Sequence, residues 1–242
     1  SLKDMERPEQ VFQLLHPDLP SEFPPLRSPD TLAHNLPVQA TSFIGRQPEI
    51  HEITGLFDDA RSVTLTGIGG TGKTRLAIEV GRESLDTYSD GVWFVDLSPI
   101  TDEPLVQREV ASVLGIEEEV LNDSLHDKNL LLLLDNCEHL LDTCARAVRT
   151  WLAQAPGVRV LATSREALGI PGEVVRRISS LSAPDESSVS SETLMEFEAT
   201  RLFAERAAEV HAAFELTDEN CASVARIARR LDGIPLAIEL AA

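Results

Sequence analysis

Short apolar runs alternate with amphipathic stretches from about residue 61 onward. The apolar runs predict strands, and the stretches between them, at about 73–86, 104–114 and 138–153, have the apolar spacing of helices. The predicted strands are Val63–Thr66, Val92–Leu97, Leu130–Leu134, Val158–Thr163 and Val174–Ile178. Strands that alternate with helices are typical of a parallel sheet covered on both faces. We therefore predict an α/β domain over residues 41–181.

The pattern changes on both sides of this domain. Seven of the 14 prolines lie before residue 40, so residues 1–40 are predicted to form an extended linker. A polar linker is predicted at Ser182–Thr193. Helical spacing without further strands follows over 194–242, so we predict a small helical domain there. The chain begins with Ser1 and ends inside a predicted helix, and we expect it to be a piece of a longer protein.

Two stretches within the helical domain, 197–211 and 218–231, carry apolar residues at helical spacing. Asp232-Gly233 is expected to end the second helix, and Pro235 is suited to the first turn of another.

Residues 67–74 read Gly-Ile-Gly-Gly-Thr-Gly-Lys-Thr, a complete phosphate-loop motif between a predicted strand and a predicted helix. Its glycines let backbone N–H groups surround a phosphate, and the helix N-terminus favours negative charge. Lys73 is expected to reach the β- and γ-phosphates, and the Thr74 hydroxyl is expected to bind Mg²⁺. The alternative is a glycine-rich turn without a ligand, which this setting disfavours. The predicted nucleotide contacts are Gly67, Gly69, Gly70, Thr71, Gly72, Lys73, Thr74 and Arg75.

The aliphatic run Leu130–Leu134 is followed by Asp135. An acid at the carboxyl end of a buried parallel strand lies where such sheets bind ligands. Asp135 is predicted to hold Mg²⁺, directly or through water, together with Thr74. The alternative is that Asp135 caps the helix predicted from Glu138. No second acid follows directly, and Glu138 and His139 could orient a water but are expected at the surface.

Another predicted strand ends in Thr163, Ser164 and Arg165. If it lies beside the phosphate-loop strand, Arg165 points toward the γ-phosphate and can sense it. The alternative is a solvated arginine paired with Glu166. The residues alone leave both open.

Charge and cysteine content narrow the class of protein. The formal net charge of −19 disfavours direct DNA or RNA binding, which requires clusters of Lys and Arg. The three cysteines argue against a disulfide framework and favour a reducing cytoplasm, with Cys137 and Cys144 as buried hydrophobic residues on one helix. We see no secretion signal, no stretch able to span a membrane and no Cys/His metal site.

Five motifs occur in the order found in one known family, and the chain resembles the NB-ARC class of STAND ATPases over about residues 40–242. That class includes plant resistance proteins, apoptosome proteins and bacterial regulators of the AfsR and LuxR-like type. The motifs are Phe43-Ile-Gly-Arg46, the phosphate loop, Leu130–Asp135 with Asn136, Thr163-Ser-Arg165 and Gly233-Ile-Pro-Leu-Ala237.

The resemblance implies further roles. Ile44 and Arg46 are expected to pack on adenine, Pro235 and Leu236 to lie against the base and ribose, and Arg165 to sense the γ-phosphate. In two respects the chain differs from the family. Asn136 replaces a frequent second acid, which argues against brisk hydrolysis, and the family's winged-helix segment with its nucleotide-sensing histidine is absent from residues 1–242.

The opening residues resemble the end of a class III adenylate or guanylate cyclase domain. The matching residues are Leu2, Lys3, Asp4, Pro8, Phe12, Gln13 and Leu14. This short match implies a parent protein in which a cyclase is fused to the nucleotide-binding module.

Together these features predict an ATP/ADP-binding, Mg²⁺-dependent switch module of a signalling or transcriptional regulator, with slow hydrolysis. Its expected partners are adenine nucleotide, other domains of the parent chain and, in a nucleotide-dependent way, further copies of itself. The alternative is a kinase or a brisk ATP-hydrolysing enzyme. A GTPase is disfavoured because the chain has no Asn-Lys-x-Asp element.

Overall fold

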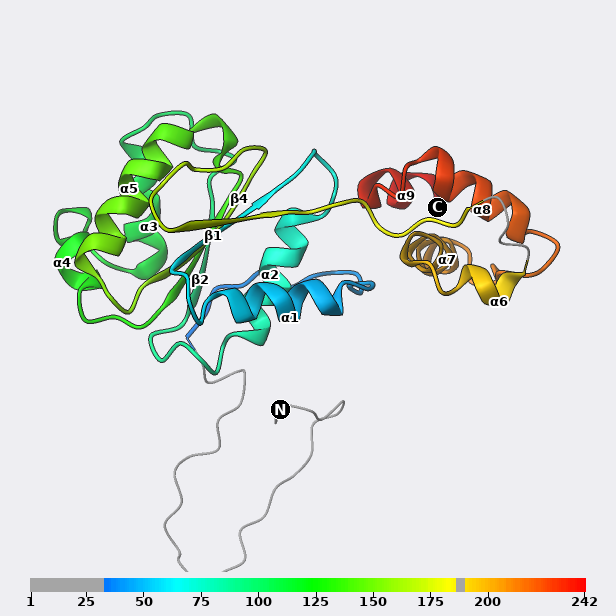
Figure 1. Ribbon diagram of the computed structural model, residues 1–242, viewed down its shortest axis with the longest axis horizontal. Coiled ribbons are helices and arrows are strands. Elements are labelled where there is room, and N and C mark those ends of the chain that lie inside the picture. Colours follow the sequence, from blue (N-terminus) through cyan, green and yellow to red (C-terminus); the bar gives the residue numbers. More distant parts are fainter. Residues whose placement is uncertain (1–32, 186–189) are drawn as a thin grey trace, which may run out of the picture.

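The computed structural model describes residues 33–185 and 190–242, which form an α/β unit and a helical unit (Figure 1). The connection after the last strand runs from the first unit to the second. The cyclase-like residues Leu2 to Leu14 lie outside the described residues, and so does most of the predicted linker 1–40.

Five parallel strands form one sheet in the order β2-β3-β4-β1-β5. They are β1 (Ser62–Thr66), β2 (Val92–Asp96), β3 (Leu131–Asp135), β4 (Arg159–Ser164) and β5 (Glu173–Arg177). This confirms the predicted fold class. Because Thr66 pairs with Ser164 and β4 lies between β1 and β3, the carboxyl ends of these three strands meet at one edge.

Helices cover both faces of the sheet. Leu131 and Leu133 share one core with residues of α1 (Gln47–Leu56) and α2 (Lys73–Glu83). Leu132 and Leu134 face the opposite core. That core is formed with α3 (Leu105–Leu114), α4 (Leu121–Leu125), η3 (Cys137–His139) and α5 (Leu141–Gln154), and the short turn η2 (Glu118–Val120) precedes α4 without a buried residue. Burial on both sides explains why β3 is an unbroken aliphatic run.

The helical unit consists of α6 (Ser191–Leu194), α7 (Glu198–Val210), α8 (Cys221–Arg230) and α9 (Pro235–Ala241). It has its own core, in which Leu202 and Phe203 pack with residues of α8 and α9. Ile44 packs against this core and the neighbouring Phe43 packs against the core that contains α1 and α2, so the segment before α1 contacts both units.

Several elements differ from the predicted pattern. α1 was not predicted, because its apolar residues are few. The helix predicted from residue 138 begins at Leu141, since Asn136 adopts a left-handed conformation with φ 65° and a 3-10 turn follows. Cys137 and Cys144 are both buried, but Cys137 lies in that turn. The end of the predicted polar linker is helical, where the Ser190 hydroxyl caps α6 by accepting from the Thr193 N–H.

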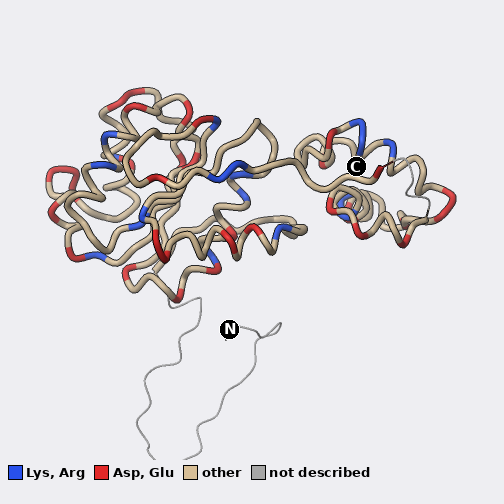
Figure 2. The backbone as a smooth tube through the Cα atoms, in the orientation of Figure 1, with Lys and Arg blue, Asp and Glu red and all other residues tan. Residues whose placement is uncertain are grey.

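Acidic residues are spread over both units and outnumber basic ones (Figure 2). Among residues 33–185 and 190–242, no helix has the length and apolar character needed to cross a membrane.

Two glycines with left-handed backbones differ in the space available for a side chain, so alanine should destabilise the fold to different extents at the two positions. Gly115 has φ +67° and open space where a Cβ would lie, whereas a Cβ on Gly233 (φ +64°) would come within 2.2 Å of the Leu181 carbonyl oxygen. The Leu181 N–H also donates to the Gly233 carbonyl at 2.9 Å. Both alanine variants carry the left-handed penalty of about 1–2 kcal/mol. We expect Gly233→Ala to lose at least about 1 kcal/mol more than Gly115→Ala in urea unfolding, since backbone must also move. Equal losses would contradict the close approach.

Candidate nucleotide-binding site

The phosphate loop joins β1 to α2 at the edge where β1, β3 and β4 end. Gly70 and Gly72 have φ +80° and +84°, a region that other residues rarely adopt. A Cβ on Gly70 would also lie 3.1 Å from the Leu236 Cβ of α9. The backbone conformation therefore favours glycine at both positions, and the close approach of α9 adds a second reason at Gly70.

Lys73 is the first residue of α2 and its side chain folds back over the loop. Its Nζ donates to the carbonyl oxygens of Gly67 (2.8 Å) and Ile68 (3.1 Å). Burial lowers the pKa of this ammonium, while the nearby Glu138 carboxylate acts in the opposite direction. An ammonium held over the loop in this way can exchange these carbonyl acceptors for phosphate oxygens.

Three side chains from α2, β3 and β4 meet at the sheet edge. The hydroxyls of Thr74 and Thr163 donate to the same oxygen of Asp135, at 2.8 Å and 2.6 Å. Burial raises the pKa of the Asp135 carboxyl above its usual range. Within the described part of the chain no side chain caps η3 or α5, so Asp135 does not have the capping role considered as an alternative.

The Thr74–Asp135 pair fits a Mg²⁺ ion. Mg²⁺ is commonly held by one or two protein oxygens together with substrate phosphates and water. A hydroxyl and a carboxylate beside the phosphate loop supply such oxygens. In the described residues no cluster of three or more His, Cys, Asp or Glu side chains offers an alternative metal site. The predicted metal role of both residues remains a prediction.

Arg165 directly follows β4, the strand beside β1, which is the placement that its predicted sensor role required. Its Nε donates to the Glu138 carboxylate at 3.1 Å, so its ion-pair partner is Glu138 and not Glu166. The Glu138 side chain is 21% exposed, because the 3-10 turn after Asn136 directs it back toward the site. The sequence had placed Glu138 at the surface.

One cavity of about 360 Å³ brings together the phosphate loop and residues from both ends of the chain. Its lining includes Ile44, Arg46, Pro235 and Leu236, the four residues assigned to the base end, as well as Arg75 and Arg165. Further lining residues that the sequence had not assigned are Phe43, Asn136, Glu138, Thr163, Leu181, Leu202 and Glu239. Glu239 could have been recognised, since it lies four residues after Pro235 on the same helix face.

Arg46 is 3% exposed and adopts a left-handed conformation with φ 60°. Its Nη2 donates to the Ser179 carbonyl at 2.8 Å. Its Nη1 is buried and has no hydrogen-bond partner among the described residues, and it lies 4.0 Å from where a Cβ on Gly72 would be. A buried unpaired donor beside the phosphate loop is a polar atom for which a ligand can provide the partner.

Comparisons with known proteins place the sequence among bacterial proteins. No model of a protein family matches it. It is 36% identical over 242 residues to an uncharacterized protein of Mycobacterium tuberculosis, covering 96% of this chain and 58% of that protein. It is also 44% identical over 189 residues to a protein of the same organism whose name describes it as an HTH-type transcriptional regulator. That match covers 75% of this chain and 20% of the other protein. The regulatory protein AfsR of Streptomyces coelicolor is 28% identical over 155 residues, and the match covers 54% of this chain and 15% of AfsR.

Two solved structures share the architecture. A STAND protein with a tetratricopeptide repeat sensor from Pyrococcus horikoshii has a TM-score of 0.51 and 16% identity, covering 81% of this chain and 29% of that one. A Walker-type ATPase of Pyrococcus abyssi has a TM-score of 0.51 and 14% identity, and the match covers 81% of this chain and 66% of that one. At this identity the likeness shows the fold.

The chain therefore spans less than two thirds of the relatives to which it is similar. It has the α/β fold of P-loop NTPases, and its sequence is similar to parts of bacterial regulatory proteins.

Proposed function

We propose that this chain binds adenine nucleotide with Mg²⁺ and acts as an ATP/ADP switch module of a larger signalling or transcriptional regulator. One observation carries the proposal. The phosphate loop from Gly69 to Thr74, Arg165 and the base-end residues line one cavity, and the Thr74 hydroxyl donates to Asp135 at 2.8 Å. Although the chain has a formal net charge of −19, Lys73 and three arginines line this cavity around the phosphate loop. The arginines are Arg46, Arg75 and Arg165.

The γ-phosphate is the group that distinguishes ATP from ADP. A ligand shifts a conformational equilibrium only by its differential affinity for the two states. The groups able to contact the γ-phosphate are Lys73, Arg165 and the Mg²⁺ held by Thr74 and Asp135. Arg165 donates to Glu138 through Nε, which leaves its Nη groups able to donate to this phosphate while Glu138 stays engaged.

Slow hydrolysis follows from the same geometry. The position after Asp135 is Asn136, which cannot take a proton from water. Glu138 is the nearby acid, and it is engaged by Arg165 at 3.1 Å. A brisk ATPase or a kinase requires a free group to orient its nucleophile, and it would turn over at about 1 per second or faster.

The surroundings of the module are also part of the proposal. The similarity to segments of larger regulators suggests that the partners are other domains of the parent chain. Nucleotide-dependent self-association in the cytoplasm is consistent with a switch of this kind. The acidic surface disfavours direct contact with nucleic acid.

The sensor assignment can be tested with Arg165→Ala. We expect about tenfold weaker binding of ATP and ADP binding within about twofold of the unmodified chain. A tenfold loss of affinity is at the low end of what a charge-assisted hydrogen bond contributes, and we expect this value because the Arg165 side chain is 68% exposed to solvent. Calorimetric titration of ATP, ADP and GTP with Mg²⁺ measures all three affinities, and GTP is expected to bind more weakly than ATP.

Arg177→Ala is the matched control, since Arg177 ends β5 on the other side of β1 and is exposed. It should leave both affinities unchanged. Equal weakening of ATP and ADP by Arg165→Ala would contradict the sensor role, and failure of the unmodified chain to bind any nucleotide would contradict the proposed function.

A further inference from the structure

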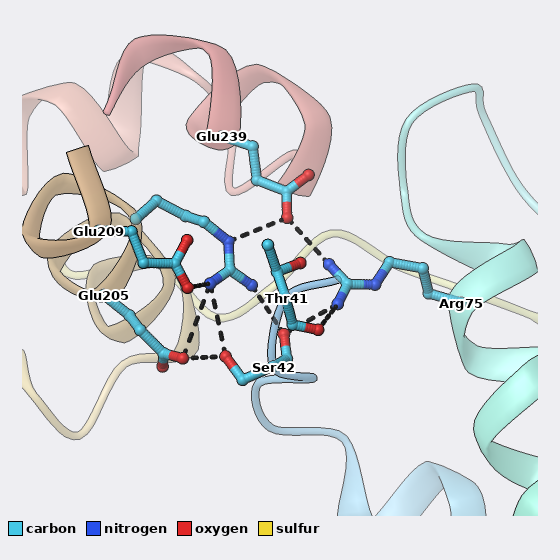
Figure 3. A network of polar contacts seen from close by, with 7 residues as sticks. Thr41, Ser42, Arg75, Glu205, Glu209 and Glu239 are labelled. Atoms are coloured by element: carbon cyan, nitrogen blue, oxygen red, sulfur yellow. Dashed lines mark hydrogen bonds and ion pairs between the residues drawn. The ribbon is translucent and has the colours of Figure 1, made fainter. Parts of the chain in front are cut away.

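Two arginines from different units share one glutamate beside the cavity (Figure 3). Arg75 of α2 donates through Nη1 to Glu239 Oε1 at 2.9 Å, and Arg206 of α7 donates through Nε to the same oxygen at 3.3 Å. Glu239 belongs to α9, the helix whose Leu236 N–H donates to the Gly70 carbonyl of the phosphate loop at 3.2 Å. The network therefore connects the phosphate-loop helix with the helical unit.

The same arginines hold the segment that leads into the base end of the cavity. Arg75 Nη2 donates to the carbonyls of Thr41 and Ser42, both at 2.8 Å, and Arg206 Nη2 donates to the Ser42 carbonyl at 2.7 Å. The Ser42 hydroxyl is also bonded to Glu205. Ile44 and Arg46 follow within four residues of Ser42 and line the cavity. The position of the base end is thus fixed by the same two guanidinium groups.

Burial makes these ion pairs stronger than ordinary surface pairs. The Arg206 side chain is 7% exposed and lies within 3.6 Å of Glu205, 2.9 Å of Glu209 and 3.3 Å of Glu239. Arg75 and Glu239 are 24% and 29% exposed. Removing one member of a partly buried network leaves uncompensated charge, which costs far more than breaking an exposed pair. Arg206 is 6% exposed as a whole residue and carries no lining role in the cavity.

Arg75, Glu239 and Phe43 line the cavity at this junction, and the Arg75 guanidinium lies 6.0 Å from the centre of the Phe43 ring. A nucleotide in the cavity would be enclosed between the phosphate loop and α9. Movement of α9 and of the segment before α1 away from the loop would open the cavity further and speed the release of a bound nucleotide. The ion pairs that oppose this movement therefore act on the rate of release.

We propose that the Arg75–Glu239–Arg206 network is a clasp that retains nucleotide by holding α9 and residues 41–46 against the phosphate loop. The inference rests on the proposed function, because it requires a bound nucleotide. The clasp joins residues 164 positions apart in the chain, and contacts outside it also connect the units. The Arg46 N–H donates to Glu198 at 2.8 Å, so opening the clasp loosens the junction without unfolding either unit.

The decisive variant is Glu239→Gln, which keeps the size of the side chain and removes its charge. The chain is loaded with N-methylanthraniloyl-ADP and Mg²⁺, and the release rate is measured by fluorescence after addition of excess ADP. We expect release at least about tenfold faster than from the unmodified chain. Arg206→Met should have a similar effect although Arg206 does not line the cavity, so a lost nucleotide contact cannot explain it.

Arg82→Ala is the matched control, because Arg82 is also on α2 but its side chain is 49% exposed and pairs with Glu79 at 3.6 Å, outside the clasp. Its release rate should equal that of the unmodified chain. Raising the salt concentration from about 50 to about 500 mM should accelerate release from the unmodified chain more than from Glu239→Gln, since salt screens the ion pairs. Thermal unfolding of each variant is measured as well, to check that the variant is folded.

The possible results separate the two proposals. If Glu239→Gln binds the fluorescent ADP and releases it within about twofold of the unmodified rate, the clasp is wrong and the proposed function stands. If the unmodified chain binds no fluorescent ADP, the proposed function and the clasp are both wrong. If Arg206→Met fails to fold, Arg206→Lys takes its place, because lysine keeps the charge but not the planar set of donors that bonds both Glu239 and Ser42, and it should also release nucleotide faster.

Discussion

Lys73→Ala is expected to weaken ADP and ATP binding at least about 100-fold, which corresponds to about 2.7 kcal/mol. The ammonium already lies over the loop, within 2.8 Å of the Gly67 carbonyl, so it does not have to be repositioned to bind phosphate. Alanine removes a charge-assisted hydrogen bond and the positive charge that the loop supplies to a polyphosphate. Titration of ADP and ATP into the variant measures the loss.

The fold should tolerate this substitution. Among the residues that the structure describes, Lys73 bonds only to carbonyls of its own loop. Burial also lowers the pKa of its ammonium, so the folded state does not depend on this charge. Lys128→Ala is the matched control, because Lys128 pairs with Asp90 at 2.9 Å away from the cavity lining. Nucleotide affinity of Lys73→Ala within a few-fold of the control would show that the loop is not a phosphate site.

The sequence was sufficient to predict the strands and the loop, because their signals are local. β3 is buried on both faces and therefore reads as an uninterrupted leucine run, and the phosphate loop needs glycine and lysine at fixed spacing. The order of strands is not local. Only the insertion of β4 between β1 and β3 brings Thr163 onto Asp135, and nothing in the spacing of residues indicates that hydrogen bond.

Two parts of the site depended on features that the sequence pattern conceals. The apolar spacing of α5 extends back to residue 138, so the sequence predicts a helix that begins there. Instead, Asn136 has a left-handed backbone and a 3-10 turn follows, which directs the Glu138 side chain toward Arg165. The clasp requires Arg75 of α2 to reach Glu239 of α9, which follows from how the units are docked. The Phe43-Ile-Gly-Arg46 and Gly-Ile-Pro motifs indicated the base end only through their family resemblance.

Asp135→Asn is expected to weaken Mg²⁺-dependent nucleotide binding at least about 10- to 100-fold, the loss typical even of groups one step removed from a metal. Asparagine can still accept from Thr74 and Thr163 through its Oδ1, but it lacks the negative charge that Mg²⁺ prefers. Binding of ADP without Mg²⁺ should change little. Titrations with Mg²⁺ and with a chelator distinguish the two effects.

The same substitution should leave stability at neutral pH unchanged or increase it. Burial raises the pKa of Asp135, so the folded state holds this proton more tightly than the unfolded state does. Stability associated with this group is therefore highest at low pH and falls as pH rises through the folded pKa. A neutral side chain removes that cost at pH 7, and the difference from the unmodified chain should vanish below the unfolded pKa of about 3.9.

Asp90→Asn provides the opposite control. The Asn129 N–H and the Lys128 ammonium lower the pKa of Asp90, so its carboxylate stabilises the fold above the unfolded pKa. That variant should lose stability at pH 7 and keep its Mg²⁺-dependent binding. Urea unfolding at pH 7 and at low pH measures both. If Asp135→Asn instead loses stability at pH 7 with nucleotide binding intact, Asp135 is a structural carboxylate that orders β3, β4 and α2, and the metal must be held elsewhere.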